Sequence, residues 1–237
     1  MDRKLAIVFG GSRGIGAACV NELQAAGYAV AWTYVSKPPV NTGGDQVKAY
    51  KADVQNPDEV AKVFSDAERD FGVPPSCVVA NAGINVPPAP IGTFEADRFR
   101  QLMDVNLFGA FNVLSESARR VADGGSIIGI TTSMVRAAMP GGGPYTASKA
   151  AVESLLRSMS KELAARGIRV NGVAPGPVDT DLFSAGKTEE AKGKAAMLSP
   201  FQRIGRPEEV GRVVRFLASD DATWVHGQIV QPNGGMI

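Results

Sequence analysis

Residues 4–19 read KLAIVFGGSRGIGAAC, where an apolar run breaks into glycines and then into small residues that favour a helix. A glycine inside a strand or helix costs about 1 kcal/mol relative to alanine, so such a cluster needs a reason. Two explanations fit: a tight turn that binds nothing, or a turn whose backbone approaches a phosphate. Because the glycines lie between a predicted strand and a predicted helix, the free N–H groups of the first helical turn can bind a pyrophosphate. The spacing of Gly10, Gly14 and Gly16 is not GxGxxG, and no Lys-Ser or Lys-Thr follows to make a Walker loop.

The composition is that of an ordinary globular protein. The chain has 237 residues, of which 44% are hydrophobic and 21% charged, and no linker divides it, so we expect one domain over residues 1–237. Lys and Arg number 25 against 24 Asp and Glu, which gives no support to a nucleic-acid or membrane-surface partner. Cys19, Cys77 and the single His226 are too scattered for a disulfide or a metal site. The short apolar start and the absence of an eighteen-residue apolar run predict a cytoplasmic protein.

Seven short β-rich runs alternate with helical patterns along the chain. They cover residues 4–10, 28–34, 47–53, 76–81, 125–131, 168–174 and 228–232. The longest helix is expected from about residue 144 to 166, with Gly167 ending it, and Pro57 and Pro207 mark the starts of two more. Strands that are apolar on both faces and alternate with helices predict a doubly wound α/β fold, with a parallel sheet covered on both sides.

The segment PYTASKAAVES opens the longest predicted helix. Tyr145 and Lys149 are four residues apart in it and therefore share one helix face. A phenol has a pKa of about 10, and a nearby ammonium group favours the phenolate, so Tyr145 could exchange a proton near neutrality. A tyrosine and a lysine at this spacing can also form a solvated surface. Together with the glycine turn, however, the pair indicates chemistry on a nucleotide.

Four motifs in this order resemble the short-chain dehydrogenase/reductase family. They are GGSRGIG, Asn81-Ala82-Gly83, the Tyr145 to Lys149 segment and Pro175-Gly176. The match covers essentially the whole chain, and residues 203–235 also resemble the 3-oxoacyl-carrier-protein reductase branch. The resemblance implies a Rossmann fold with seven parallel strands in the order 3-2-1-4-5-6-7. It also implies hydride transfer between NAD(P) and a carbonyl or alcohol, with a 3-oxoacyl thioester or a similar small ketone as the expected substrate.

The resemblance assigns roles to individual residues. Tyr145 becomes the general acid, and Lys149 lowers its pKa and holds the nicotinamide ribose. Asn106 matches a residue that holds a water between this lysine and solvent, although an exposed or capping asparagine would look the same. The remaining cofactor contacts are expected from Gly10, Ser12, Arg13, Gly14, Ile15, Gly16, Asp53, Val54, Asn81, Ala82, Gly83, Pro175, Gly176, Val178 and Thr180. For Asp53 a solvated carboxylate, and for Pro175-Gly176 a simple turn, are the alternatives.

Two departures from the family pattern affect the site. Phe9 stands where the family usually has a threonine, so a side-chain hydrogen bond that steadies the glycine turn is missing. We expect cofactor binding to survive, because backbone N–H groups contact the phosphates. The hydroxyl that orients the substrate is ambiguous: strand alignment favours Thr132, whereas Ser133 has the usual residue type. We choose Ser133 as the catalytic residue and keep Thr132 as the alternative.

The end of the second predicted strand bears on the choice of cofactor. NAD-preferring relatives carry an acid there, and this chain has Tyr34. Arg13, Ser36 and Lys37 can donate to a 2′-phosphate, so we predict NADP(H), with no metal. The alternative is that Arg13 and Lys37 are merely solvated.

Substrate and assembly are less determined by the sequence. A lid is expected around residues 180–200, and its composition does not identify the substrate. The helix of Asn106 carries apolar residues beyond one core stripe, including Phe108, Phe111 and Leu114, and the family pairs such helices, so we expect a homotetramer. The alternative is that these side chains only face the parent sheet. Three function classes remain: an active carbonyl reductase, a cofactor-binding sensor or scaffold, and an epimerase or dehydratase.

Overall fold

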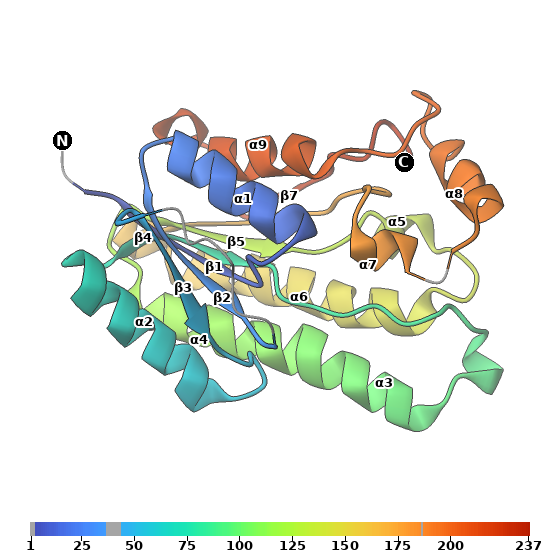
Figure 1. Cartoon of the computed structure of the whole chain (residues 1–237), viewed down its shortest axis with the longest axis horizontal. Coiled ribbons are helices and arrows are strands. Elements are labelled where there is room, and N and C mark those ends of the chain that lie inside the picture. The colour runs from blue at the N-terminus through green and yellow to red at the C-terminus, as the bar shows by residue number, and fades with distance from the viewer. Residues whose placement is uncertain (1–2, 37–43, 186) are drawn as a thin grey trace.

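A computed structural model describes residues 3–36, 44–185 and 187–237. One parallel sheet of seven strands has the order β3-β2-β1-β4-β5-β6-β7, with helices on both faces (Figure 1). The strands are β1 (Leu5–Phe9), β2 (Ala29–Tyr34), β3 (Val47–Lys51), β4 (Pro75–Ala80), β5 (Ser126–Ile130), β6 (Arg169–Val173) and β7 (Ile229–Val230). The predicted doubly wound α/β fold is confirmed, including its strand order.

Helices cover both faces of the sheet. They are α1 (Gly14–Ala25), α2 (Pro57–Phe71), α3 (Ala96–Met103), α4 (Ala110–Arg120), α5 (Met134–Ala137), α6 (Gly143–Glu162), α7 (Asp181–Ser184), α8 (Glu189–Ala196) and α9 (Pro207–Ala218). Successive residues of a strand point to opposite faces, so Leu5, Ile7 and Phe9 join the core under α2, α4 and α6. Ala6 and Val8 join the core under α1 and α9. This double burial explains why the strands are apolar throughout.

Local signals in the sequence place the helix starts. The Asn56 side chain accepts hydrogen bonds from the backbone N–H groups of Asp58 and Glu59 at the start of α2. At the start of α9, the Glu209 carboxylate accepts from the backbone N–H of Arg206 at 2.7 Å. Both helices begin at the prolines that predicted them. The helix α6 begins one residue before its predicted start, and Gly167, with φ of 65°, ends the 3₁₀ turn that follows it.

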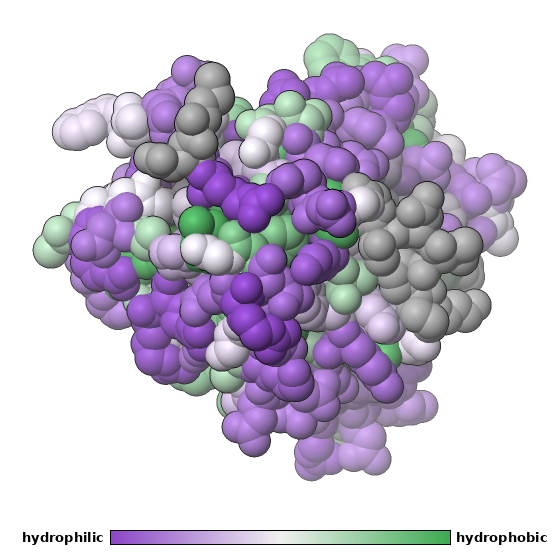
Figure 2. Space-filling view, turned by 60° about the vertical axis from the view of Figure 1, so that its left-hand side comes forward, coloured by the Kyte–Doolittle hydropathy of each residue, from purple (hydrophilic) through white to green (hydrophobic). Residues whose placement is uncertain are grey.

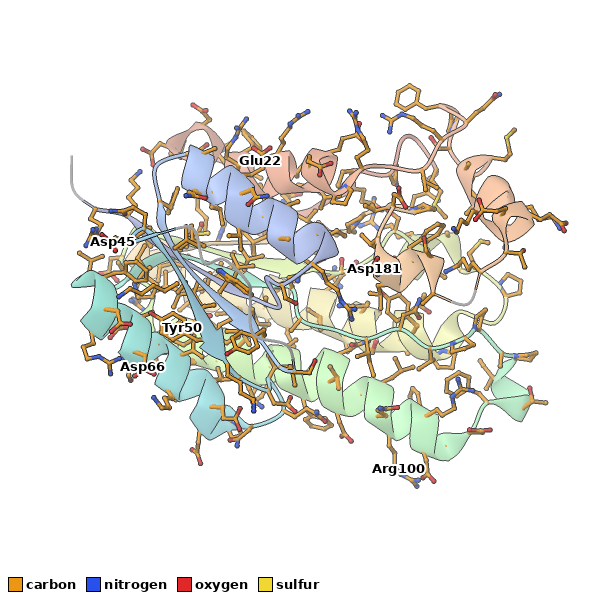
Figure 3. The ribbon with its side chains drawn as sticks, viewed as in Figure 1. Glu22, Asp45, Tyr50, Asp66, Arg100 and Asp181 are labelled. Carbon is orange, nitrogen blue, oxygen red and sulfur yellow. The ribbon has the colours of Figure 1, made fainter. Side chains whose placement is uncertain are left out.

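Charged side chains hold α1 and α9 together above the sheet. Glu22 of α1 forms an ion pair with Arg215 of α9, with 2.9 Å between Oε2 and the guanidinium nitrogen, and Figure 3 shows Glu22 on the side of α1 that faces α9. A Cβ atom on Gly211 would lie 2.9 Å from the carbonyl oxygen of Ala18, so glycine at this position allows the two helices to approach. This packing holds α1, which begins at the glycine turn, in place against α9.

A π-helical segment, Asp104–Gly109, joins α3 to α4. The sequence pattern did not predict it, because wide turns of this kind depend on contacts outside the helix. One such contact is at Gly109, where a Cβ atom would lie 2.6 Å from Cγ2 of Val54. The segment carries Asn106, whose side chain is fully buried.

The three apolar residues expected to lie outside the core-facing stripe, Phe108, Phe111 and Leu114, differ in their burial. Leu114 is buried in the core below the sheet, so its inclusion in that group was wrong. Phe108 and Phe111 are 58% and 49% exposed. The face of the molecule in Figure 2 is mostly hydrophilic, with apolar side chains reaching the surface in its middle. Within the described ranges, no helix combines the length and apolar character needed to span a membrane.

The docking of α6 on the sheet generates a first prediction. A Cβ atom on Gly129 of β5 would lie 2.7 Å from Cδ1 of Leu156. Gly129→Ala should therefore cost about 1–3 kcal/mol of unfolding free energy through overpacking, and Leu156→Ala about 2–5 kcal/mol through a cavity. In the double variant, the added methyl group enters that cavity. The double variant should therefore lose less unfolding free energy than the sum of the two single losses.

Urea unfolding of the single and double variants measures this coupling. Gly193→Ala is the matched control, because nothing lies within 4 Å of a Cβ atom there and α8 tolerates alanine. Strict additivity of the Gly129 and Leu156 effects would show that this contact does not position α6.

Candidate functional site

The glycine turn between β1 and α1 has no room for side chains. A Cβ atom on Gly10 would lie 2.9 Å from Cα of Ala82, and one on Gly16 would overlap the carbonyl oxygen of Gly10. Gly10 also has φ of 79°, in the left-handed region that favours glycine. The glycines are therefore needed for the fold of the turn and for its contact with the segment after β4.

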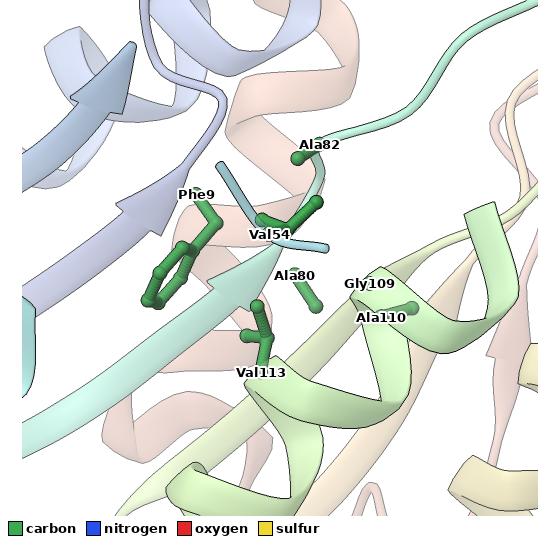
Figure 4. Close-up of a pocket in the computed structure, with 7 residues that line it drawn as sticks. All are labelled: Phe9, Val54, Ala80, Ala82, Gly109, Ala110 and Val113. Carbon is green, nitrogen blue, oxygen red and sulfur yellow. The ribbon is translucent and has the colours of Figure 1, made fainter. Parts of the chain in front are cut away.

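A residue of β2 supplies a side-chain hydrogen bond to the glycine turn, which Phe9 cannot do. The backbone N–H of Gly10 donates to Oγ1 of Thr33 at 2.9 Å, and that of Gly11 donates to the Thr33 carbonyl at 3.0 Å. Nδ2 of Asn81 donates to the Gly10 carbonyl at 2.8 Å. Phe9 itself is buried and lines an apolar pocket with Val54 and neighbouring core residues (Figure 4). The turn is thus held from both neighbouring strands.

The N-terminus of α1 is open to an anion. Arg13 stands at its N-cap position without a capping side-chain hydrogen bond, and the first turn contains no acidic residue. By contrast, Thr188 caps α8, and Glu189 and Glu190 lie in its first turn. The residues of its own first turn therefore do not neutralise the positive end of the α1 dipole, which favours a pyrophosphate there.

Polar and basic side chains surround the edge of this turn. Ser12, Arg13 and Ser36 are exposed, and Tyr34 is half-buried at the end of β2. Among the residues that the structure describes, no carboxylate forms an ion pair with Arg13. Lys37, the other predicted contact to a 2′-phosphate, lies outside the described residues.

The predicted adenine contacts lie after β3. Asp53 is half-buried, and its carboxylate accepts from the backbone N–H of Gln55 at 3.0 Å. Val54 is buried, and its methyl groups meet Gly109 of the π-helical segment. Val54 lies near Ala82 on the wall of the apolar pocket (Figure 4).

Three elements meet around Lys149. Its ammonium donates to the carbonyl oxygen of Ile130, at the end of β5, at 3.0 Å. A Cβ atom on Gly83 would lie 3.3 Å from Nζ of Lys149 and 3.1 Å from Oδ1 of Asn106. Asn106 accepts from the backbone N–H of Ile84 at 2.8 Å and donates to its carbonyl at 2.9 Å. Gly83 thus allows the asparagine and the lysine to approach the loop after β4.

Burial changes the pKa of both members of the Tyr145 and Lys149 pair. It raises the pKa of the Tyr145 phenol to about 12 and lowers the pKa of the Lys149 ammonium to about 8. No attraction between the two groups contributes, so the predicted lowering of the Tyr145 pKa by Lys149 is absent in the protein alone. A phenol with a raised pKa is protonated at neutral pH and has a proton to donate.

The two candidate hydroxyls after β5 have different surroundings. Ser133 is fully buried; its Oγ donates to the Ala174 carbonyl at 2.7 Å and accepts from Nδ2 of Asn233 at 3.1 Å. Thr132 is 8% exposed, and its Oγ1 accepts from the backbone N–H of Met134 at 3.3 Å. Within the described part of the chain, the Thr132 hydroxyl proton has no acceptor.

The segment after β6 approaches the glycine turn. Val178 is buried and pairs with Gly205, and the backbone N–H of Gly176 donates to the Pro232 carbonyl at 3.2 Å. Oγ1 of Thr180 accepts from the N–H of Phe183 and caps α7. A Cβ atom on Gly14 would lie 3.0 Å from Cγ2 of Thr180. The predicted nicotinamide wall, which Pro175 begins, therefore reaches the phosphate end of the site.

The predicted lid contains α7 and α8, which lie at the same end of the molecule as the start of α1 (Figure 1). Asp181 projects from α7 near that end (Figure 3). Leu182 of α7 is 39% exposed, and Met197 and Phe201, after α8, are 63% and 71% exposed. In the described ranges, no cluster of three or more His, Cys, Asp or Glu side chains is arranged to hold a metal ion.

Comparison with known proteins identifies the family. A family model described as enoyl-(acyl carrier protein) reductase matches residues 10–237. A short-chain type dehydrogenase/reductase of Picea abies is 40% identical over 99% of this chain and 92% of its own length. The chain belongs to the short-chain dehydrogenase/reductase family.

Two further relatives carry names that mention a cofactor. One, an NADPH-dependent aldehyde reductase-like protein, chloroplastic, from Arabidopsis thaliana, is 40% identical over 99% of this chain and 94% of its own. The other is a solved structure, a blue fluorescent protein from a metagenomic library in complex with NADPH. It has a TM-score of 0.89 and 34% identity, and the match covers 98% of this chain and 97% of that one. The fold and the order of the site motifs are those of this family of oxidoreductases.

The buried charge of Lys149 generates a prediction on stability. Lys149→Met removes that charge, so at pH 7 the unfolding free energy of the variant should exceed that of the wild type by ~1–3 kcal/mol. The lost hydrogen bond to the Ile130 carbonyl reduces this gain. Folded Lys149 loses its proton near pH 8, whereas the unfolded side chain keeps it up to about pH 10.5. The advantage of the variant is therefore constant below pH 8 and declines as the pH rises toward 10.5.

Urea unfolding at neutral and alkaline pH, with exposed Lys161→Met as control, measures this difference. A Lys149→Met variant that is less stable than the wild type at pH 7, or whose advantage grows with pH, would contradict the assignment of a strained buried charge.

Proposed function

We propose that this protein is an NADPH-dependent carbonyl reductase that converts an aldehyde or ketone into an alcohol, with Tyr145 as the proton donor. One observation carries the proposal: the segment of residues 81–83 contacts both halves of the site. Asn81 binds the Gly10 carbonyl of the glycine turn, and Gly83 lies against Lys149. A dinucleotide bound at the α1 N-terminus is thereby brought toward the Tyr145 and Lys149 pair.

The residues present fit NADPH as the cofactor. The uncapped N-terminus of α1 would hold the pyrophosphate, and Asp53 and Val54 the adenine. Arg13 and Ser36 would hold the 2′-phosphate, since Tyr34 replaces the acid that binds a free 2′-hydroxyl. Lys149 would bind the nicotinamide ribose. Bound NADPH supplies a hydride to the carbonyl carbon.

Residues of the protein supply the proton and stabilise the charge left behind. Tyr145, whose phenol is protonated at neutral pH, gives its proton to the carbonyl oxygen while the carbon is reduced. Lys149, most of whose positive charge persists at neutral pH, would stabilise the phenolate left behind once NADPH is bound, an attraction that is absent in the protein alone. A hydroxyl of the turn after β5 would orient the carbonyl. The sensor and the epimerase or dehydratase classes are less supported, because every position needed for carbonyl reduction is filled.

Apolar side chains support an apolar substrate. Ile91, 79% exposed, approaches the N-terminus of α6, where its Cδ1 would lie 3.4 Å from a Cβ atom on Gly143. Cε of Met134 would lie 2.9 Å from a Cβ atom on Gly142. The aldehyde reductase name of one relative favours a small carbonyl compound, and the resemblance of residues 203–235 favours a 3-oxoacyl thioester. A screen of aldehydes, ketones and acetoacetyl thioesters with NADPH distinguishes these substrates.

Assembly and location extend the proposal. The exposed Phe108 and Phe111 lie on the helix that the family uses for pairing, which supports a homotetramer. The cytoplasmic location stays a prediction from the sequence. The chloroplastic relative makes a second location worth testing. Light scattering at micromolar concentration checks the assembly, and a monomer would contradict it.

Loss of the transferable proton is the direct test of the chemistry. Tyr145→Phe keeps the ring but removes the hydroxyl, so turnover should fall by about 10²- to 10⁴-fold while NADPH binding stays nearly unchanged. Steady-state kinetics and fluorescence titration measure the two effects. Turnover near the wild-type level would remove Tyr145 from the mechanism.

The charge at the glycine turn is the direct test of the cofactor. Arg13→Ala should weaken NADPH binding about 10- to 100-fold and hardly change NADH binding, because only NADPH carries the 2′-phosphate. Arg100→Ala is the matched control, since Arg100 pairs with Asp97 on the outer side of α3 (Figure 3). Equal loss of both cofactors, or a wild type that prefers NADH, would contradict the proposal.

A further inference from the structure

Residues near the C-terminus contact the turn after β5. Asn233 is 8% exposed, and its Nδ2 donates to Oγ of Ser133 at 3.1 Å. Ser133 in turn donates to the Ala174 carbonyl at 2.7 Å, and its backbone N–H donates to the Pro175 carbonyl at 2.9 Å. The turn that carries Thr132 is therefore bound to residues one hundred positions away.

The same asparagine supports the predicted nicotinamide wall. A Cβ atom on Gly176 would lie 3.0 Å from Cα and Cβ of Asn233, so only glycine permits this approach. Oδ1 of Asn233 accepts from the backbone N–H groups of Gly235 at 2.9 Å and Met236 at 3.2 Å. These bonds fix the orientation of the side-chain amide toward Ser133.

The next residue, Gly234, contacts the end of the lid. Oγ of Ser199 donates to the Gly234 carbonyl at 2.7 Å and accepts from the N–H of Phe201 at 3.1 Å. Ser199 is 5% exposed, whereas Phe201 beside it is 71% exposed. Gly234 has φ of 64°, and a Cβ atom there would overlap the Ser199 hydroxyl. The polypeptide after α8 is thus anchored to the same C-terminal segment.

We propose that Asn233 and Gly234 form a clasp that positions the catalytic turn and the lid together. In this arrangement Ser133 is a positioning residue, and Thr132 presents the hydroxyl that contacts the substrate carbonyl. The inference rests on the proposed carbonyl reductase function. It goes beyond that function because it assigns a role to residues that are distant in sequence from every motif used to identify the site.

The geometry predicts how the effects divide. The clasp holds the turn, the lid and the nicotinamide wall but does not contact the glycine turn that holds the pyrophosphate, so Asn233→Ala should lower kcat about tenfold and change NADPH affinity less than kcat. Ser133→Ala should have a similar effect, and the double variant should lose little more than either single one, because each substitution removes the same Asn233–Ser133 hydrogen bond. Thr132→Ala should reduce turnover more than Ser133→Ala, and Thr132→Ser should restore most of it.

A second readout does not depend on activity. Asn233→Ala frees the end of the lid, so trypsin should cleave after Lys192 and Lys194 of α8 faster than in the wild type. Gln24→Ala, which removes an exposed amide side chain on α1, is the matched control and should leave kinetics and proteolysis unchanged. Thermal unfolding checks that each variant is folded, and Ser133→Ala replaces Asn233→Ala if the latter does not fold.

The outcomes separate the two proposals. A wild type that reduces none of the carbonyl compounds with NADPH refutes the proposed function, whereas the proteolysis still tests the clasp. A folded Asn233→Ala variant with wild-type kcat, multiplicative losses in the double variant, or unchanged cleavage of α8 would each overturn the clasp. A lower melting temperature without a change in kcat would show a purely structural role and would also overturn it.

Discussion

The contact between the glycine turn and the segment after β4 is the constraint on which the site depends. The backbone of Gly10 meets that of Ala82 at a distance that excludes any side chain, and Asn81 holds the Gly10 carbonyl. This approach brings the open end of α1 and the loop carrying Gly83 into one place at the carboxyl edge of the sheet. In doubly wound sheets that edge, where the strand order reverses, is where nucleotides bind.

The same end of the molecule contains two buried groups that are costly to charge. Burial favours the neutral forms of Tyr145 and Lys149, and the Ile130 carbonyl compensates only part of the cost for the ammonium. The packing of Leu156 against β5 and β6 holds α6 in place and so keeps both groups buried. Core packing thus keeps a neutral proton donor, Tyr145, one helical turn from Lys149, whose lowered pKa of about 8 lies close to neutral pH.

The remaining parts of the site come from segments far apart in the sequence. The turn after β5, the segment after β6, the lid and the C-terminus meet through hydrogen bonds of Ser133, Asn233 and Ser199. The hydroxyls of Ser133 and Ser199 both donate to backbone carbonyls, so they fix the path of the chain and are not free to donate to a substrate. A site built in this way keeps its reactive groups on α6 and its adaptable surface on the lid.

The sequence by itself determined the strands, the main helices, the glycine turn and the spacing of Tyr145 and Lys149, because these follow from periodicity and from residues close together along the chain. It could not determine that Thr33 would supply a side-chain hydrogen bond to the glycine turn, which Phe9 cannot do, since this depends on the register of β1 with β2. The π-helical turn at Asn106, the burial of Leu114 and the occupation of the Ser133 hydroxyl by Asn233 are likewise products of tertiary packing. Local patterns specify the elements, whereas the environment of each side chain depends on which distant segments pack against it.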